Sequence, residues 1–103
     1  MEYIFKKEVA PGIIVHTIGV GQNLMLCYVT LKKGAVLPEH AHPHEQASFV
    51  VSGRMKFSLR GQEIDCSCGT GLVFQPNEAH SAVAIEDTVV VDSFTPIRQD
   101  YLR

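Results

Sequence analysis

The 103-residue sequence lacks the features that mark several large classes of protein. It has no internal repeat, no low-complexity segment and no apolar run near the ~20 residues that a membrane-spanning helix needs. Its first residues do not show the basic-then-apolar order of a signal peptide. A net charge of −2 provides no basic surface for a nucleic acid or an anionic membrane. We therefore expect a cytoplasmic protein that binds neither nucleic acid nor membrane.

Cysteine is scarce, and its odd number argues against a disulfide framework. The three cysteines are Cys27, Cys66 and Cys68, whereas a small secreted domain held by disulfides carries an even number. The last two are spaced like half of a zinc site, but no second close pair exists. Alternation along a strand is expected to place both of their sulfurs on one face. We interpret all three as buried or surface thiols rather than redox or metal groups.

The length fits a single domain, which we expect to span residues 1–103. Apolar residues alternate with polar ones over short segments, and no segment combines a helical apolar period with caps at both ends. The predicted strands are rich in β-branched residues and are separated by Gly, Pro, Asn or Asp: Ile13–Ile18, Leu24–Leu31, Ser48–Ser52, Met55–Leu59, Glu63–Cys66, Leu72–Gln75, Ser81–Ile85 and Thr88–Phe94. This spacing predicts an all-β fold, either a sandwich or a small barrel.

Two of these strands are apolar on both faces. Phe49–Val51 is one uninterrupted apolar run, and Val89–Val91 is another. A closed barrel has only one interior, so a second apolar face must be covered by another segment or another subunit. On that ground we expect a homodimer.

Three of the five histidines fall within the five residues His40-Ala41-His42-Pro43-His44. Residues i and i+2 of a strand share a face, so His40 and His42 can direct two imidazoles at one metal ion. If the chain stays extended past the proline, Gln46 faces inward with them and Glu45 faces away. We expect His44 at the rim of such a site.

A further histidine reaches the same place through a turn. The Pro76-Asn77 turn returns the chain after a predicted strand, which in an antiparallel barrel can place His80 opposite His40 and His42. A single histidine in a strand is more often a packed or surface residue than a ligand, and we interpret His16 in that way. The pair together with His80 makes metal binding the better interpretation.

These segments resemble the two sequence motifs of the cupin family. Gly34-(five residues)-His40-x-His42-(three residues)-Gln46-(six residues)-Gly53 is similar to the first motif, and Gly71-(four residues)-Pro76-x-Glu78-x-His80 to a shortened second one. The resemblance implies a small antiparallel jelly-roll β-barrel (a double-stranded β-helix), usually dimeric, that holds one divalent transition metal. The ligands that it implies are His40, His42, Gln46 and His80. The sequence departs from the family at Gln46, where most cupins have Glu, and at Ala84, where the second motif usually ends in Asn.

The glutamine bears on the chemistry. Three neutral imidazoles and a neutral amide leave the charge of the ion uncompensated, which favours Lewis-acid work on an anionic or carbonyl-bearing small molecule. A carboxylate ligand would help to hold iron through redox cycling, so Gln46 argues against oxygen chemistry. Ni, Zn, Co, Mn and Fe are all candidate metals.

The last strand and the tail contain a second group of candidate residues. Asp92 and Phe94 share a face by alternation, and Arg98 follows a proline that can fold it back over the barrel mouth. From the residues alone, a strand end with a solvated tail is the alternative. The tail is nevertheless similar to that of a narrower group of cupins, the KdgF-like proteins of pectin degradation, although Gln99 stands where Glu is frequent.

Members of that group convert an unsaturated uronate, released by lyases from pectin or alginate, into its open-chain keto form. The resemblance implies that Asp92 and Arg98 are catalytic and that Phe94 and Arg98 bind substrate. We favour a metal-dependent isomerase that ring-opens and ketonises a small uronate-like acid. A non-catalytic cupin that binds a small ligand and a metal-dependent dioxygenase are the alternatives. Asp92 favours catalysis, because pure binding needs no proton carrier.

Overall fold

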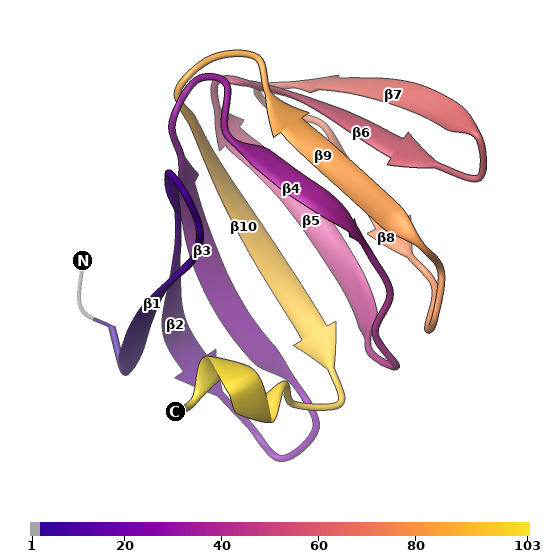
Figure 1. Ribbon diagram of the computed structural model, residues 1–103. Coiled ribbons are helices and arrows are strands. Elements are labelled where there is room, and N and C mark those ends of the chain that lie inside the picture. The colour runs from indigo at the N-terminus through magenta and orange to yellow at the C-terminus, as the bar shows by residue number, and fades with distance from the viewer. Residues whose placement is uncertain (1–2) are drawn as a thin grey trace.

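A computed structural model describes residues 3–103 and shows two antiparallel sheets packed face to face (Figure 1). The larger sheet has the order β1-β2-β3-β10-β5-β8, and the smaller sheet has the order β4-β9-β6-β7. The elements are β1 (Phe5–Ala10), β2 (Ile13–Val20), β3 (Met25–Leu31), β4 (Val36–His40), β5 (Glu45–Ser52), β6 (Arg54–Leu59), β7 (Gln62–Ser67), β8 (Gly71–Phe74), β9 (His80–Ala84), β10 (Thr88–Thr95) and the single 3-10 turn η1 (Gln99–Tyr101). The prediction of an all-β antiparallel jelly roll is confirmed.

All eight predicted strands are present near their expected bounds, but the sequence does not predict β1 and β4. Both are edge strands of their sheets, which explains their weak signals. β1 exposes Lys6, Lys7 and Glu8 one after another, so it has no apolar alternation. β4 contains Pro38, which has no backbone N–H to donate to a neighbouring strand. An edge strand tolerates a proline because one of its two sides has no neighbouring strand to bond.

The interior of the barrel changes from apolar to polar along β10. Val90 pairs with Val29 and Val50 on the neighbouring strands, and all three are buried. Two residues further along the same face, Asp92 pairs with Ser48, which is also buried. Alternation along β10 therefore directs a carboxylate into the barrel near the end at which the strand stops.

The outer face of the larger sheet keeps exposed apolar side chains. Leu26, Phe49, Val51 and Val73 are each 40–49% exposed. Beside them, His16 is buried by stacking on Tyr28, with ring centroids 4.1 Å apart. The second apolar face expected from the sequence is present, and nothing in the described part of this single chain covers it.

The three cysteines are free thiols, but Cys66 and Cys68 do not share a face. Cys66 is buried in β7, which ends at Ser67, whereas Cys68 is exposed in the following turn. There its thiol donates to the carbonyl of Val51 at 3.0 Å. The expectation of a shared face was wrong because it extended strand alternation one residue beyond β7. Within residues 3–103, no helix is long and apolar enough to cross a membrane.

Candidate metal centre and active site

Three imidazoles converge at one end of the barrel. His40 ends β4 and pairs in register with His80, which begins β9. His42 lies in the loop after β4, and one ring nitrogen from each of the three residues lies within 4.8 Å of the others. We call this group the histidine cluster. It is suited to binding a metal ion, because three imidazoles with an open further position are a common metal-binding arrangement.

Backbone carbonyls fix the orientation of each ring in the histidine cluster. Nδ1 of His40 lies 2.9 Å from the carbonyl oxygen of Pro38, Nδ1 of His42 lies 3.0 Å from that of His44, and Nδ1 of His80 lies 2.8 Å from that of Glu78. An Nδ1–H donated to a carbonyl leaves the Nε2 lone pair free, which is the tautomer that a metal ligand requires. Nε2 of His80 is buried and has no hydrogen-bond partner among the described residues, so a metal ion would satisfy it.

His42 presents a conflict that a bound cation resolves. Its Nδ1 faces the His44 carbonyl, and its Nε2 lies 2.9 Å from Oε1 of Gln46, so both nitrogens face acceptor oxygens. Burial, followed by the positive charge of Arg98, lowers the pKa of His42 to about 4, so the neutral ring has only one proton to donate. A cation bound by both Nε2 of His42 and Oε1 of Gln46 would remove this conflict.

The loop that carries His42 is held by the second motif. The N–H of Asn77 donates to the carbonyl of His42 at 2.7 Å, and Asn77 has a left-handed backbone with φ of 63°. β4 stops at His40 and β5 begins at Glu45, so the chain does not stay extended past Pro43, which was the condition for Gln46 to face inward. Gln46 is nevertheless buried beside the cluster, and Glu45 is exposed.

His44 lies at the edge of this site. It is half-buried and does not belong to the histidine cluster, and its ring centroid is 5.4 Å from that of His42 and 6.5 Å from that of Phe94. Burial and the charge of Arg98 lower the pKa of His44. This placement at the rim is the one expected from the sequence.

A chain of buried side chains leads from Gln46 to Asp92. Nε2 of Gln46 donates to Oγ of Ser48 at 3.0 Å, and Ser48 donates to Oδ1 of Asp92 at 2.5 Å. Burial raises the pKa of Asp92 to about 6, although the bonds to Ser48 and Gln46 and the charge of Arg98 oppose the shift. A carboxyl with a pKa near neutrality can accept and return a proton, as general acid–base catalysis requires.

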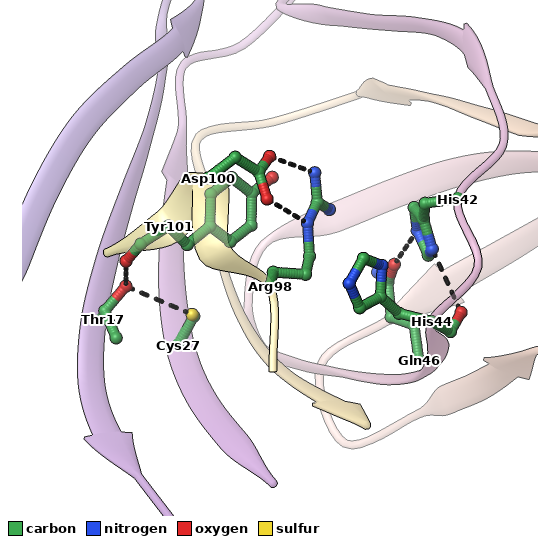
Figure 2. A network of polar contacts seen from close by, with 8 residues as sticks. All are labelled: Thr17, Cys27, His42, His44, Gln46, Arg98, Asp100 and Tyr101. Atoms are coloured by element: carbon green, nitrogen blue, oxygen red, sulfur yellow. Dashed lines mark hydrogen bonds and ion pairs between the residues drawn. The ribbon is translucent and has the colours of Figure 1, made fainter. Parts of the chain in front are cut away.

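The tail after β10 folds back over the open end of the barrel, so the alternative of a solvated tail is wrong. Figure 2 shows Arg98 between Asp100 on one side and His42 and His44 on the other. The guanidinium carbon of Arg98 lies 3.9 Å from the ring centroid of Tyr101 and 5.1 Å from that of Phe94. Its Nε and Nη2 donate to the carboxylate of Asp100 at 3.2 and 2.8 Å. Three of the five N–H groups of the guanidinium stay available to a ligand.

The tail itself is anchored by Thr17, whose hydroxyl donates to the carbonyl of Tyr101 at 2.7 Å (Figure 2). One cavity is lined by candidate residues from all these segments: His40, Gln46, His80, Asp92, Phe94 and Arg98. Apolar residues of the barrel interior, such as Val90 and Phe57, also line this cavity. The structure thus brings metal-binding, acid–base and anion-binding groups to one space.

Three residues of the site were missed from the sequence. Ser48 was detectable in principle, because it lies two residues after Gln46 on the same strand face. Asp100 and Tyr101 carried no local signal, since their contacts with Arg98 depend on the fold of the tail.

Comparisons with known proteins agree with this geometry. Residues 27–93 match the family model of the cupin domain. The chain is 31% identical over 98 residues to the pectin degradation protein KdgF of Dickeya dadantii (strain 3937), which covers 93% of this chain and 89% of that protein. The structure of KdgF from Halomonas sp. matches with a TM-score of 0.87 and 35% identity over 92% of this chain and 90% of that one. An RmlC-like cupin from Shewanella frigidimarina NCIMB 400 also has a TM-score of 0.87, with 28% identity over 93% and 86% of the two chains.

Proposed function

This chain belongs to the cupin family and is similar to KdgF over most of its length, and from that premise we propose that it is a metal-dependent isomerase of a small unsaturated uronate. The observation that carries the proposal is one cavity lined by His40 and His80 of the histidine cluster, by the buried Asp92 and by Arg98. We propose that residues 1–103 act as one catalytic domain.

In this proposal His40, His42, Gln46 and His80 hold one divalent transition metal, which is Ni, Zn, Co, Mn or Fe. A bound divalent ion supplies Lewis-acid polarisation of a substrate oxygen. The four ligands are neutral, so they leave the charge of the ion available to an anionic substrate. The absence of a carboxylate among the ligands supports isomerase rather than dioxygenase chemistry.

Arg98 binds the substrate carboxylate through the N–H groups that Asp100 leaves free, and Phe94 forms the apolar side of the subsite. Stacking on Tyr101 and pairing with Asp100 keep the guanidinium in one orientation, which lowers the entropy lost on binding.

Asp92 moves the protons. As a carboxylate it accepts the proton of the C1 hydroxyl, while the bond between C1 and the ring oxygen breaks and its electron pair stays on that oxygen. Protonation of this oxygen, which stays attached to C5, leaves an aldehyde at C1 and an enol at C5. Loss of the enol proton and protonation at C4 then give the C5 ketone. No atom is gained or lost overall, so the reaction is an isomerisation and needs no oxidant.

We also propose that two copies associate through the outer face of the larger sheet. Leu26, Phe49, Val51 and Val73 give that face exposed apolar side chains, which a second copy of the same face can cover. Light scattering is expected to give twice the 11.4 kDa of the chain, and Phe49→Lys is expected to give the monomer mass. A monomeric parent at micromolar concentration would exclude the dimer. The three free thiols support our placement of the protein in the cytoplasm.

The function is tested with untagged protein, metal analysis and an unsaturated uronate prepared with a pectin or alginate lyase. We expect about one transition metal per chain and loss of the ultraviolet absorbance of the conjugated double bond, with the keto product visible by NMR. A chelator should stop turnover, and the metal should restore it. Binding of the uronate without product would support the ligand-binding alternative, and uptake of oxygen would support the dioxygenase.

A further inference from the structure

Ser48 is a buried hydroxyl that connects the two halves of the site, and the proposed reaction gives it no task. It is 4% exposed on the inner face of β5, where it pairs in register with Asp92 of β10. Its oxygen accepts a hydrogen bond from the amide nitrogen of Gln46 and donates one to the carboxylate of Asp92. Ser48 is therefore the middle member of a chain that ends at the histidine cluster through Gln46.

The direction of this chain follows from what each group can donate. A carboxylate can only accept, so the single proton of the Ser48 hydroxyl goes to Asp92. The Ser48 oxygen is then left as an acceptor, and only the NH2 end of the Gln46 amide can fill that role. The other end of the amide, Oε1, consequently faces Nε2 of His42.

We propose that Ser48 is a positioning residue that holds the Gln46 amide with its oxygen toward the histidine cluster, and so makes this glutamine a metal ligand. The inference rests on the proposed metal-dependent function and deepens it. An amide has one end that can bind a cation and one that cannot, and the two ends are nearly equal in shape. Without Ser48 the NH2 group loses its 3.0 Å bond and keeps only its contact with Asp92, so it can turn toward the cluster, where it would repel a cation.

A carboxylate at position 46 would need no such guide, because its two oxygens are equivalent. Because this chain has Gln46 where most cupins have Glu, Ser48 is needed to orient the side chain. With a glutamate at position 46, this role of Ser48 would not exist. This difference separates a positioning role from a purely structural one. If Ser48 had only a structural role, its replacement would weaken metal binding equally with glutamine or glutamate at position 46.

The test is a double-mutant cycle read out as cobalt affinity without substrate. Co(II) is competed against a chromophoric chelator for the parent, Ser48→Ala, Gln46→Glu and the double variant. We expect Ser48→Ala to weaken cobalt binding by about 10- to 100-fold in the parent background, the usual loss when a group that orients a ligand is removed. In the Gln46→Glu background, the same change should weaken binding by no more than about threefold. Ser93→Ala is the matched control, because Ser93 is next to Asp92 but points to the opposite face of β10.

Equal losses in both backgrounds, or no loss in either, would overturn the proposal. If the alanine variant does not fold, Ser48→Cys keeps the volume with a weaker hydrogen-bonding group and is measured in the same cycle. The outcome is independent of the reaction. The expected cobalt pattern without turnover of any uronate would refute the proposed function and support the role of Ser48. Turnover of a uronate, together with equal losses of cobalt affinity in both backgrounds, would support the proposed function and refute the role of Ser48.

Discussion

The two sides of the cavity are held in place in different ways. In the histidine cluster, each ring is fixed by a carbonyl only two residues away along the chain. Gln46, Ser48 and Asp92, which lead away from the cluster, are instead joined by side-chain bonds, and the bond between Ser48 and Asp92 crosses from β5 to β10 over 44 positions of the chain. Arg98 is likewise fixed by the side chains of Asp100 and Tyr101.

This difference predicts at which residues the effects of substitutions are independent and at which they depend on one another. A histidine fixed by the backbone keeps its orientation when a neighbouring side chain is changed. A side chain fixed by other side chains loses its orientation when any member is removed, so effects on that side should be non-additive. The predictions below test this contrast, beginning with the largest effect.

Removing one ring of the histidine cluster should abolish metal binding. His80→Ala deletes a buried ring of the cluster but leaves the backbone contacts of His40 and His42 unchanged. We expect the bound metal to fall from about one per chain to the background of the assay, as measured by mass spectrometry of the purified protein. His44→Ala is the matched control and should retain the metal, since His44 is outside the cluster. A His80→Ala variant that keeps its metal would show that the cluster is not the binding site.

Removing the charge of Asp92 should separate turnover from metal content. Asp92→Asn keeps the shape and an acceptor oxygen for Ser48 but cannot accept a proton as a carboxylate does. We expect kcat to fall by about 10²- to 10⁴-fold, the usual contribution of a general acid–base group, with metal content unchanged. The measurement is steady-state turnover beside metal analysis of the same preparation. Unaffected turnover would remove Asp92 from the mechanism.

The pH dependence should reveal the same carboxyl. Because burial raises the pKa of Asp92 to about 6, the group is protonated and inactive as a base below that pH. kcat/KM is therefore expected to rise as the pH increases through about 6 and then to level off. His42, whose pKa is lowered to about 4, should remain neutral and able to bind metal through this range. A profile that is flat between pH 5 and 7, with metal fully bound, would contradict this assignment of the base.

The contrast between the two groups of residues also explains which features of the site could be predicted from the sequence. Alternation along β10 was enough to place Asp92 and Phe94 on one face, because strand parity is a local property. The inward direction of Gln46 was expected only if the chain stayed extended past Pro43, and the structure reaches the same direction without that extended run. The bond between Ser48 and Asp92 was not detectable, since it depends on β5 and β10 being neighbours in register. The exposed edge strand β1 escaped prediction for a related reason, because an edge needs no apolar pattern.

The smallest effect should come from Asp100, which acts on substrate only through Arg98. Asp100→Asn removes an ion pair with an Nη2 to Oδ2 distance of 2.8 Å but leaves the guanidinium stacked on Tyr101. The Asp100 side chain is half-exposed, so water screens this pair and it contributes at most about 1 kcal/mol. We therefore expect KM for the uronate to rise about two- to fivefold with kcat nearly unchanged. Asp65→Asn, which breaks the exposed pair with Arg54 on the smaller sheet, is the matched control and should change neither constant. A fall in kcat as large as the rise in KM would mean that Asp100 orders the reacting groups as well as the carboxylate subsite. The whole tail would then belong with the side chains whose substitutions have non-additive effects.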